Sequence, residues 1–542
     1  MHYCRSPWAI IVIMLGVLSL LLAFAWQRGQ PKPLADASVT SLPCVSYAPF
    51  RRPGSTPLTP LGAVTAAQIE ADLTLLRRLT RCVRTYGVAR GLDAVPSVAR
   101  KLGMRVRQGV WLGRDEAANR VEIDRAIALA NDYRDVIDVL IVGNEVMLRR
   151  DLSVEQLASH LRAVKSGTTI NVTYADVWEF WQRHAVLQGD VDWVTVHILP
   201  YWEDVPVAAS AAADHVFKIA HEMQRLFAGK PVWVGETGWP VAGRQRARAR
   251  PGVFEQTLLI RQLASRAAVE AVPINIIEAF DQPWKRALEG AMGGAWGLFS
   301  ADGTQRVSFA GPVVEAPDEW HVWMGAGVGL LIGTIAAALG VRSPQMRGRR
   351  RAAAEKIAIA GFGAASIGAA AVMHWAFIVL WSRTAREWAA ASAVALAVVV
   401  ALILMLCVLG GESGQSENRA NRAAKTVAWA RLTLLFIAAS WALILIADPR
   451  YRGFPVALFA VPAMLSVCLD LVPKMSARRD HYWRYESTFL AWALLLAAAV
   501  MVIQEGAHNY EALALAVCWA LLAAPLVRDS MTRSGEHDPS QQ

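Results

Sequence analysis

Cysteine is scarce in the sequence, and the cysteines that are present lack the spacing of a metal site. The chain has six cysteines in 542 residues, with no CxxC motif and no paired Cys and His spacing. A structural zinc site would need such pairs. The sequence therefore predicts neither a bound metal nor a cofactor.

Charged residues are also few for a chain of this length. They make up 18% of the sequence, whereas hydrophobic residues make up 54% and the mean hydropathy is +0.30. This balance excludes a purely soluble protein. Residues 43 to 315 have ordinary charge density, whereas the rest is dominated by long runs of Ala, Leu and Val. We therefore expect one polar domain and one part that lies in lipid.

The net charge of +10 could indicate nucleic-acid binding, but the positions of the basic residues favour another cause. Many of them stand in short loops between apolar runs, as the positive-inside rule describes. We therefore expect membrane lipids, and no nucleic acid, as partners.

Apolar runs of membrane-spanning length lie on both sides of the polar domain. Residues 8–26 form the first. Ala23 to Ala25 resembles a signal-peptidase site, so a cleaved signal and a retained anchor both stay open. Seven further runs lie near 320–341, 357–381, 388–410, 427–447, 454–472, 488–503 and 510–527. Few ionisable residues fall inside them, chiefly His374 and Asp470, which favours an anchor or docking module over a proton relay.

The loops between these runs differ in basic residues. One set carries Arg342, Arg347, Arg349, Arg350, Arg351, Lys356, Arg419, Arg422, Lys425, Lys474, Arg478, Arg479 and Arg484. The other set carries only Arg383, Arg386, Arg450 and Arg452. This asymmetry predicts that the polar domain lies outside and the C-terminus in the cytoplasm. The expected domains are 1–30, an anchor or signal; 43–315, the polar domain; 320–530, a helix bundle; and 531–542, a tail.

The polar domain alternates short β-branched runs with amphipathic helical stretches. The eight predicted strands begin at Cys44, Cys82, Met104, Ile137, Ile170, Val191, Pro231 and Pro273, with helices between them, for example over 66–79 and 116–133. Eight such units in about 270 residues is the size of a (β/α)8 barrel. The predicted fold class is therefore α/β, a TIM barrel preceded by one and followed by about seven transmembrane helices.

Two of the predicted strands end on a carboxylate. IDVLIVGNEV, from Ile137, ends with Asn144 and Glu145, and VWVGETGWP, from Val232, carries Glu236. In a parallel barrel, strand ends of this polarity share one rim. A lone glutamate there could be a buried hydrogen-bonding group. A pair favours glycoside hydrolysis, in which one carboxyl is the acid and the other the base or nucleophile.

Three motifs carry a family resemblance. VGNEV, WVGETGWP and WGLF, from Trp296 to Phe299, occur in this order and resemble glycoside hydrolase family 17, the retaining enzymes that act on β-1,3-glucan. The likeness covers residues 43 to 312. It implies Glu145 as acid/base, Glu236 as nucleophile, and a β-glucan oligosaccharide or polysaccharide as substrate. FDQPWK resembles the segment after strand 8, where Lys285 lies near the substrate; Gln282 stands where plant members have glutamate.

Asp176 is another polar residue at a predicted strand end. The candidate substrate contacts at the strand ends are Asn144, Tyr47, Tyr86, His197, Tyr201, Glu278, Asp281 and Gln282. Glu278 and Asp281 could orient Lys285 or bind sugar hydroxyls, or they could form scaffold salt bridges. His197 and Tyr201 could keep Glu236 ionised by hydrogen bonding, or His197 could be an ordinary rim residue.

Tryptophans gather in the loops on the strand-exit side, at positions 178, 181, 202, 239, 284 and 296. Their large apolar faces suit the C–H faces of sugars. We expect Trp239 and Trp284 to be sugar platforms, Trp202 next, and leave Trp178 and Trp181 open between platform and packing. The loop from Arg244 to Arg250 carries four arginines. It is expected to be a solvated flap, with an anionic lipid or glycan contact as the sharper alternative.

Cys44 and Cys82 begin neighbouring parallel strands in the exported domain, so we expect a disulfide between them. Two buried free thiols are the alternative.

The combination of barrel and membrane helices resembles the bacterial membrane-bound glucanosyltransferases of rhizobial cyclic β-(1,3),(1,6)-glucan synthesis. It implies a multi-pass protein of the inner membrane with a periplasmic catalytic domain that makes or branches glucan, and a glucan synthase as a candidate partner. An endo-β-1,3-glucanase, or a non-catalytic glucan-binding or export accessory, are the alternatives. Glucan passage through the bundle is a minority hypothesis.

Overall fold

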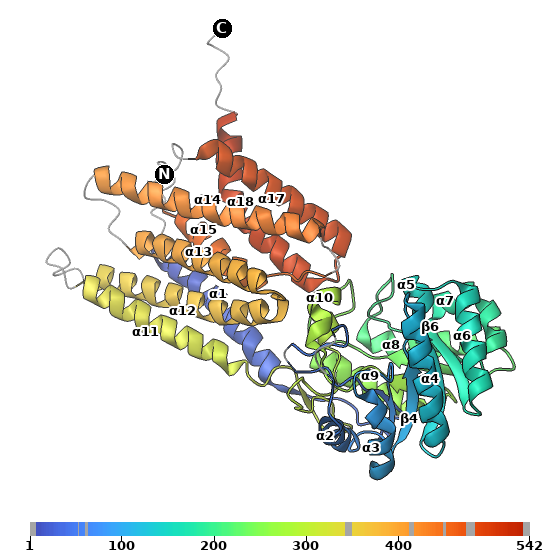
Figure 1. Ribbon diagram of the computed structural model, residues 1–542. Coiled ribbons are helices and arrows are strands. Elements are labelled where there is room, and N and C mark those ends of the chain that lie inside the picture. The colour runs from blue at the N-terminus through green and yellow to red at the C-terminus, as the bar shows by residue number, and fades with distance from the viewer. Residues whose placement is uncertain are drawn as a thin grey trace, which may run out of the picture. The chain divides into compact units, whose positions relative to one another are not determined.

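The structure is a computed structural model that describes residues 7–52, 54–59, 63–341, 350–410, 417–447, 451–472 and 483–534. The chain divides into two compact units (Figure 1). One comprises Pro31–Val313, and the other comprises the described residues before and after it. Each unit is described by itself.

The first unit is a closed barrel of eight parallel strands. The strands are β2 (Val45–Ser46), β3 (Cys82–Arg84), β4 (Arg105–Val110), β5 (Ile137–Asn144), β6 (Asn171–Val177), β7 (Trp193–His197), β8 (Val232–Thr237) and β9 (Ile274–Ile276). Each lies within or at the end of a run predicted from the sequence, which confirms the barrel. Outside it, β1 (Pro31–Lys32) pairs with β10 (Val313–Val314).

Helices follow the strands in the order that a (β/α)8 barrel requires. They are α2 (Ala66–Leu76), α3 (Val95–Leu102), α4 (Glu116–Asp132), α5 (Val146–Arg149), α6 (Val154–Gly167), α7 (Trp178–Arg183), α8 (Ala209–Leu226), α9 (Val253–Arg266) and α10 (Arg286–Glu289). Local sequence fixes several of their starts. Asp115 accepts hydrogen bonds from two backbone N–H groups at the start of α4, and Ser153 with Gln156 forms a capping box on α6.

The inside of the barrel has an apolar layer and a polar layer. Val139, Ile141, Ala175 and Trp233 pack together as a buried cluster. Toward the strand exits the interior becomes polar. The Asn275 amide donates to Ser46 Oγ (2.8 Å) and to the Gly235 carbonyl (2.9 Å), so it ties β9 to β2 and β8. These hydrogen bonds fix β8, the strand that carries the candidate catalytic residue Glu236.

Cys44 and Cys82 are joined by a disulfide in the structure. Val45 pairs with Val83, so the parallel register places the two cysteines opposite each other, with a Cα–Cα distance of 4.5 Å. Closing a loop of 38 residues stabilises the fold by about 4 kcal/mol in the chain-entropy model.

We therefore predict that thiol labelling of the unfolded, unreduced protein finds no free cysteine in residues 43 to 315, because both are bonded. Labelling after reduction should find two. Two labelled cysteines in that range before reduction would contradict the disulfide.

The second unit is a bundle of long apolar helices. They are α1 (Pro7–Gly29), α11 (Trp320–Gly340), α12 (Arg350–Trp381), α13 (Ala385–Gly410), α14 (Glu417–Ala447), α15 (Val456–Asp470), α17 (Arg484–Glu505) and α18 (Tyr510–Ser534). Within the described residues, seven helices are long and apolar enough to cross a membrane. The prediction of apolar helices before and after the barrel is thus confirmed. The run predicted over 454–472 is a helix of 15 residues, about 22 Å long, which is shorter than the hydrocarbon core of about 30 Å.

Helices α11 and α12 pack closely because small residues face each other. A Cβ atom on Gly329 would lie 2.2 Å from the Ala364 carbonyl oxygen, and one on Gly325 would lie 2.7 Å from that of Gly368. Glycine at every fourth position lets two helix backbones approach this closely, a packing that is also typical of membrane-spanning helix pairs.

Helix α1 belongs to the bundle. Its buried side, which includes Met14, Leu18 and Ala25, is part of the same apolar core as α12 and α15, and Figure 1 shows α1 in blue beside α12. At its C-terminal end, Arg28 forms an ion pair with Glu319 at the start of α11 (2.9 Å). The N-terminal segment therefore packs as an integral helix of this unit.

Charged contacts show which helix ends lie together in the bundle. Arg383 and Arg452 both pair with Glu387 (2.7 and 3.3 Å), so the segments before α13 and α15 lie at one end. Asp470 pairs with Arg528 (2.7 Å), so the last turns of α15 and α18 also lie together. Arg342, Arg347, Arg349, Arg450, Lys474, Arg478, Arg479 and the tail from residue 535 are outside the described residues.

Candidate active site

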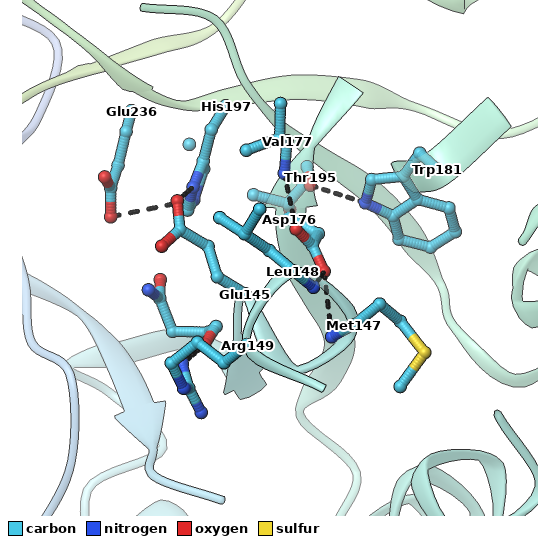
Figure 2. A network of polar contacts seen from close by, with 12 residues as sticks. Glu145, Met147, Leu148, Arg149, Asp176, Val177, Trp181, Thr195, His197 and Glu236 are labelled. Carbon is cyan, nitrogen blue, oxygen red and sulfur yellow. Dashed lines mark hydrogen bonds and ion pairs between the residues drawn. The ribbon is translucent and has the colours of Figure 1, made fainter. Parts of the chain in front are cut away.

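Glu145 stands at the turn between β5 and α5. Its backbone N–H donates to the Ala175 carbonyl (2.8 Å), which continues the pairing with β6. Its φ of 54° lies in the left-handed region that residues other than glycine seldom adopt. This conformation ends the strand and lets α5 begin at Val146. The Glu145 side chain points toward His197 and Glu236 (Figure 2).

Asp176 holds the helix that follows Glu145. Its buried carboxylate accepts hydrogen bonds from the backbone N–H groups of Met147 (3.2 Å), Leu148 (3.4 Å) and Val177 (2.8 Å), and from the Tyr174 hydroxyl. Burial raises the pKa of Asp176 to about 6, despite the Tyr174 hydrogen bond that lowers it. Asp176 thus positions α5 and is engaged by the protein rather than by a substrate (Figure 2).

Glu236 lies on β8, and Arg84 on β3 binds it across the barrel. Arg84 Nη1 donates to Glu236 Oε1 (2.8 Å) and to the Gly235 carbonyl (2.8 Å), while Nη2 donates to Asn144 Oδ1. Arg84 is fully buried. One guanidinium therefore connects the two strands that carry the glutamates, and its charge compensates the Glu236 carboxylate.

His197 lies between the two glutamates. Its Nδ1 is 3.0 Å from Glu145 Oε1, and its Nε2 is 3.6 Å from Glu236 Oε1 and 3.5 Å from Arg84 Nη1. Because an arginine N–H can only donate, these partners favour a lone pair on Nε2 and a proton on Nδ1 that Glu145 accepts. An irregularity in the β7–β8 pairing places His197 opposite Glu236.

The surroundings favour the ionised form of Glu145 in the free protein. Burial alone would raise its pKa, but the hydrogen bond from His197 and the nearby charges of Arg149 and Arg84 outweigh it. The pKa of Glu145 therefore lies below its ordinary value. An ionised Glu145 is the form that a general base needs.

The spacing of the two glutamates fits one class of glycosidase. Side-chain ligand atoms of Glu145, His197 and Glu236 all lie within 4.8 Å of one another. Retaining enzymes hold their carboxyl groups about 5 Å apart, whereas inverting enzymes need about 6.5–9.5 Å to admit a water molecule. The same three groups could in principle ligate a cation, but the Arg84 guanidinium already faces Glu236 and would repel one. The expectation of no metal stays a prediction.

Three other residues singled out from the sequence reach the same part of the barrel as Asn144 and the glutamates. Lys285 Nζ pairs with Glu278 (3.1 Å), and burial raises the pKa of Glu278 to about 7 although Lys285 opposes the shift. Tyr86 contacts Arg84, whose Cζ lies 4.8 Å from the ring centroid. The Tyr86 hydroxyl is buried and has no hydrogen-bond partner among the described residues. It is therefore available to a ligand hydroxyl.

Three predicted contacts point away from this rim, and their predicted roles need correction. Trp239 is fully buried and its Nε1 donates to the Arg250 carbonyl (2.9 Å), so it has no free face for a sugar. The buried Tyr201 donates to the Arg244 carbonyl (2.6 Å). The buried Tyr47 donates to Asp72 on α2 (3.0 Å), outside the barrel wall. Each hydroxyl or ring is already engaged by the protein.

Two residues after β9, Asp281 and Gln282, form hydrogen bonds or ion pairs with neighbouring protein groups instead of facing a substrate. Asp281 pairs with Arg306 (2.7 Å) and accepts from the Gly297 N–H (3.0 Å), which corresponds to the scaffold alternative. Gln282 is fully buried and donates to the Ala48 and Phe280 carbonyls. Its oxygen accepts from Trp284 Nε1 (2.9 Å), so it orients this half-buried ring rather than touching a substrate.

The remaining tryptophans differ in exposure. Trp202 is half-buried against Tyr201, and the Arg246 guanidinium lies 5.3 Å from its ring centroid. Trp178 is half-buried, with Nε1 donating to Glu203 (3.2 Å). Trp181 and Trp296 are buried.

The structure contradicts the expectation that the loop from Arg244 to Arg250 is a fully solvated flap. Arg244 and Gln245 are buried, and Arg246 donates to the Tyr201 carbonyl. The first half of the loop thus packs against Tyr201, and Arg248 is the exposed arginine.

Sequence reasoning missed Arg84. A charged residue in the centre of an apolar strand run, CVRTY, was the available signal, because a buried charge must have a partner. Arg84 shares the inward side of β3 with Cys82 and Tyr86, in the two-residue period of a strand.

The hydrogen bond to Glu145 gives His197 a testable effect on pH dependence. Replacing His197 by Leu removes this bond, so the pKa of Glu145 should rise toward or above its ordinary value. The acidic limb of the step that needs ionised Glu145 should then move to higher pH. The measurement is the pH profile of breakdown of the covalent intermediate from an activated donor. His160→Gln is the matched control, because His160 pairs with Glu116 on the outer helices; an unmoved limb in His197→Leu would contradict the assignment.

Comparison with known proteins shows which proteins the barrel resembles. Residues 44–297 match the family model of the BtgE/BtgC glycoside hydrolase domain. A probable beta-glucosidase btgE of Aspergillus fumigatus is 28% identical over 224 residues, which are 40% of this chain and 39% of that protein. A glucan 1,3-beta-glucosidase of Arthroderma benhamiae is 25% identical over 255 residues, 44% of this chain and 82% of that protein. The chain thus spans less than half of the first relative.

A solved structure, the family 17 beta-1,3-glucanosyltransferase of Rhizomucor miehei, is 25% identical, with a TM-score of 0.43, over 51% of this chain and 98% of that one. The matched residues 44–297 contain all eight barrel strands and both glutamates. Over these residues the barrel of this chain is therefore similar to the BtgE/BtgC glycoside hydrolase domain.

Proposed function

We propose that this chain is a β-1,3-glucan-active enzyme that works by retaining double displacement and transfers the glucanosyl unit to another glucan. The observation that carries the proposal is the approach of the Glu145 and Glu236 side chains to within 4.8 Å at one rim of the barrel. The relatives named for glucan 1,3-beta-glucosidase activity support the substrate class.

In the first step Glu236 acts as nucleophile. An Oε atom attacks the anomeric carbon, the bond from that carbon to the leaving oxygen breaks, and Glu145 supplies a proton to this oxygen. Arg84 orients the Glu236 carboxyl group through the hydrogen bond to Oε1. Glu145 must enter this step protonated, and bound substrate favours that form by excluding water from the ionised carboxylate.

In the second step Glu145 acts as base. It takes the proton of an incoming hydroxyl group, whose oxygen attacks the anomeric carbon, and the bond to Glu236 breaks. The hydrogen bond from His197 favours the ionised Glu145 that this step needs. Water yields hydrolysis, whereas a sugar hydroxyl yields a longer or branched glucan.

Transfer requires an acceptor held in attack geometry, since well-oriented neighbours reach effective molarities far above the roughly 55 M of water. Trp284 and Trp202 are the half-buried tryptophans among the predicted platforms, and Gln282 fixes the Trp284 ring. We assign them to the acceptor side. An endo-β-1,3-glucanase, which would use the same two steps but with water as the acceptor, is the alternative. The proposal also includes the formation of β-(1,6) branches.

Product sizes test the transferase assignment. Incubation of the full chain with millimolar laminari-oligosaccharides should give products longer or more branched than the donor. Trp284→Ala should shift the product ratio toward hydrolysis, because it removes an acceptor contact. Chromatography with mass spectrometry measures both. If wild-type protein gives only shorter oligosaccharides at every donor concentration, the endo-glucanase alternative stands.

A binding-only role is the candidate from a different class. A receptor or export accessory would need neither the nucleophile nor the acid. The buried Arg84–Glu236 pair and the His197 bridge favour catalysis, because a binding site gains nothing from holding two carboxylates this close.

We further propose that the helix bundle anchors the barrel in the inner membrane, with the barrel in the periplasm and the C-terminus in the cytoplasm. The loops on the proposed outer side carry only Arg383, Arg386, Arg450 and Arg452, fewer basic residues than the loops on the proposed inner side, as the positive-inside rule describes. The packing of α1 inside the bundle supports a retained anchor. Membrane lipids, and a glucan synthase supplying acceptor ends, are the proposed partners.

The orientation can be tested with reporter fusions. A periplasm-active reporter should work when inserted after Val313 and fail after Ser534, with a cytoplasmic reporter showing the reverse. The opposite pattern would invert the topology, and loss of residues 7–26 from the mature protein would exclude the anchor.

A further inference from the structure

Trp111 has no place in the catalytic steps, yet its setting is unusual for a tryptophan. It follows directly on the last residue of β4, at the strand-exit rim. Its side chain is 44% exposed, which makes it the most exposed aromatic residue in the described part of the barrel. An aromatic ring left open to water loses the free energy of apolar burial, so a ligand that covers it would gain binding energy.

The strand register places Trp111 on the inward side of the rim. Gly109 pairs with Ile141, which belongs to the apolar cluster inside the barrel. Trp111 lies two residues beyond Gly109 and so continues the same side of β4. A Cβ atom on Gly87 would lie 3.3 Å from Trp111 Cβ, so the loop after β3 packs against the base of the ring.

Arg149 fixes the ring and links it to the proposed acid/base residue. The Arg149 guanidinium lies 4.3 Å from the Trp111 ring centroid. Its Nε donates to Asp151 (2.8 Å), its Nη2 to the Leu112 carbonyl (2.7 Å), and its Nη1 to the Asn144 carbonyl. Arg149 also donates its backbone N–H to the Glu145 carbonyl (2.8 Å).

These contacts determine what the site offers to a ligand. The Arg149 guanidinium nitrogens are each engaged by carbonyl or carboxylate oxygens, so the guanidinium serves as a clamp for the ring. What remains exposed is a rigid aromatic surface beside Glu145. This surface suits a flat, uncharged ligand with apolar C–H groups.

We infer that Trp111 is a sugar platform for the β-glucan chain, a subsite beyond the sugar that reacts, and that Arg149 holds it in a fixed position relative to Glu145. The inference rests on the proposed function and deepens it, because it predicts that the enzyme recognises chain length. The occupant is one glucosyl ring, stacked on the exposed part of the indole.

The test compares Trp111→Ala and Trp111→Tyr in the full chain. The kcat/KM of Trp111→Ala should fall by about 3- to 10-fold on long laminari-oligosaccharides, with a smaller fall on a short activated aryl glycoside that fills only the nearest subsites. Trp111→Tyr should recover part of the loss. The matched control is Val269→Ala, because Val269 is 85% exposed and follows α9 at the opposite end of the barrel.

A binding measurement separates this inference from the proposed function. Calorimetry with laminarihexaose and the Glu236→Gln protein should show weaker affinity when Trp111→Ala is added. Equal losses on short and long substrates, or no loss on either, would overturn the platform while leaving the catalytic assignment intact. If neither wild-type nor Glu236→Gln protein binds laminarihexaose, the proposed function and the platform fall together.

Discussion

Glu236→Gln should abolish turnover of β-1,3-glucan, and Glu145→Gln should lower it by about 10²- to 10⁴-fold. The first change removes the nucleophile, so no covalent intermediate can form. The second removes the proton donor and later base, but leaves the attacking carboxylate with its Arg84 partner (2.8 Å). The two variants should therefore fail for different reasons.

An activated donor distinguishes the two roles. A leaving group that departs without a proton does not need the acid, so Glu145→Gln should still form the glycosyl-enzyme from such a donor. Glu236→Gln should not. Rapid-quench measurement of bound sugar gives the result, and an added nucleophile such as azide should rescue breakdown in Glu145→Gln. Equal trapping in both variants would contradict the assignment of roles.

Arg84→Met should cost about 10²-fold or more in kcat, because one guanidinium orients Glu236, Asn144 and the Gly235 carbonyl. It should also destabilise the barrel by about 3–5 kcal/mol, since a buried carboxylate loses its charge partner. Arg84→Lys should recover only part of the activity, because a single ammonium group lacks the planar geometry needed to reach two strands.

Arg107→Met is the matched control for Arg84. Arg107 is also a barrel arginine with buried guanidinium nitrogens, but its Cζ lies 4.1 Å from the Trp233 ring centroid and it touches neither glutamate. The Arg107→Met variant should be less stable than the wild-type protein, but its kcat should fall much less than that of Arg84→Met. Circular dichroism melting and kinetics on the same preparations separate the two effects. Equal loss of kcat in both variants would mean that Arg84 acts through the fold alone.

The barrel and the glutamate pair could be predicted because both depend on short-range patterns. Each strand is a compact apolar run, and a carboxylate at its exit must lie on the common rim. The sequence also predicts which cysteines meet, since Cys44 and Cys82 hold matching positions on adjacent strands.

The rim residues were harder to predict because side-chain direction alternates along a strand. Ser46 and Arg84 are paired in the register and face inward, so Tyr86 shares the inner side whereas Tyr47 points to α2. Applying the two-residue period strictly would have separated these two tyrosines. It would also have placed Trp111 on the inner side.

Loop residues obey no such period. Trp239 follows Gly238, where a Cβ atom would lie 2.2 Å from the Ile277 carbonyl oxygen, so the chain there is packed tightly against β9. The loop after it folds back and covers the Trp239 ring through Arg250. Which tryptophan is buried depends on this tertiary packing, so it could not be predicted from the local sequence pattern.

The central claim is that Glu236 becomes covalently bonded to the sugar. Incubating the wild-type chain with a 2-fluoro-glucosyl or 2-fluoro-laminaribiosyl donor should trap this intermediate, since the fluorine slows its breakdown. Peptide mass spectrometry should then find one added sugar on the peptide that contains Glu236, and none after Glu236→Gln. An adduct on the peptide that contains Glu145, or inversion of the product anomer with no adduct, would contradict the account.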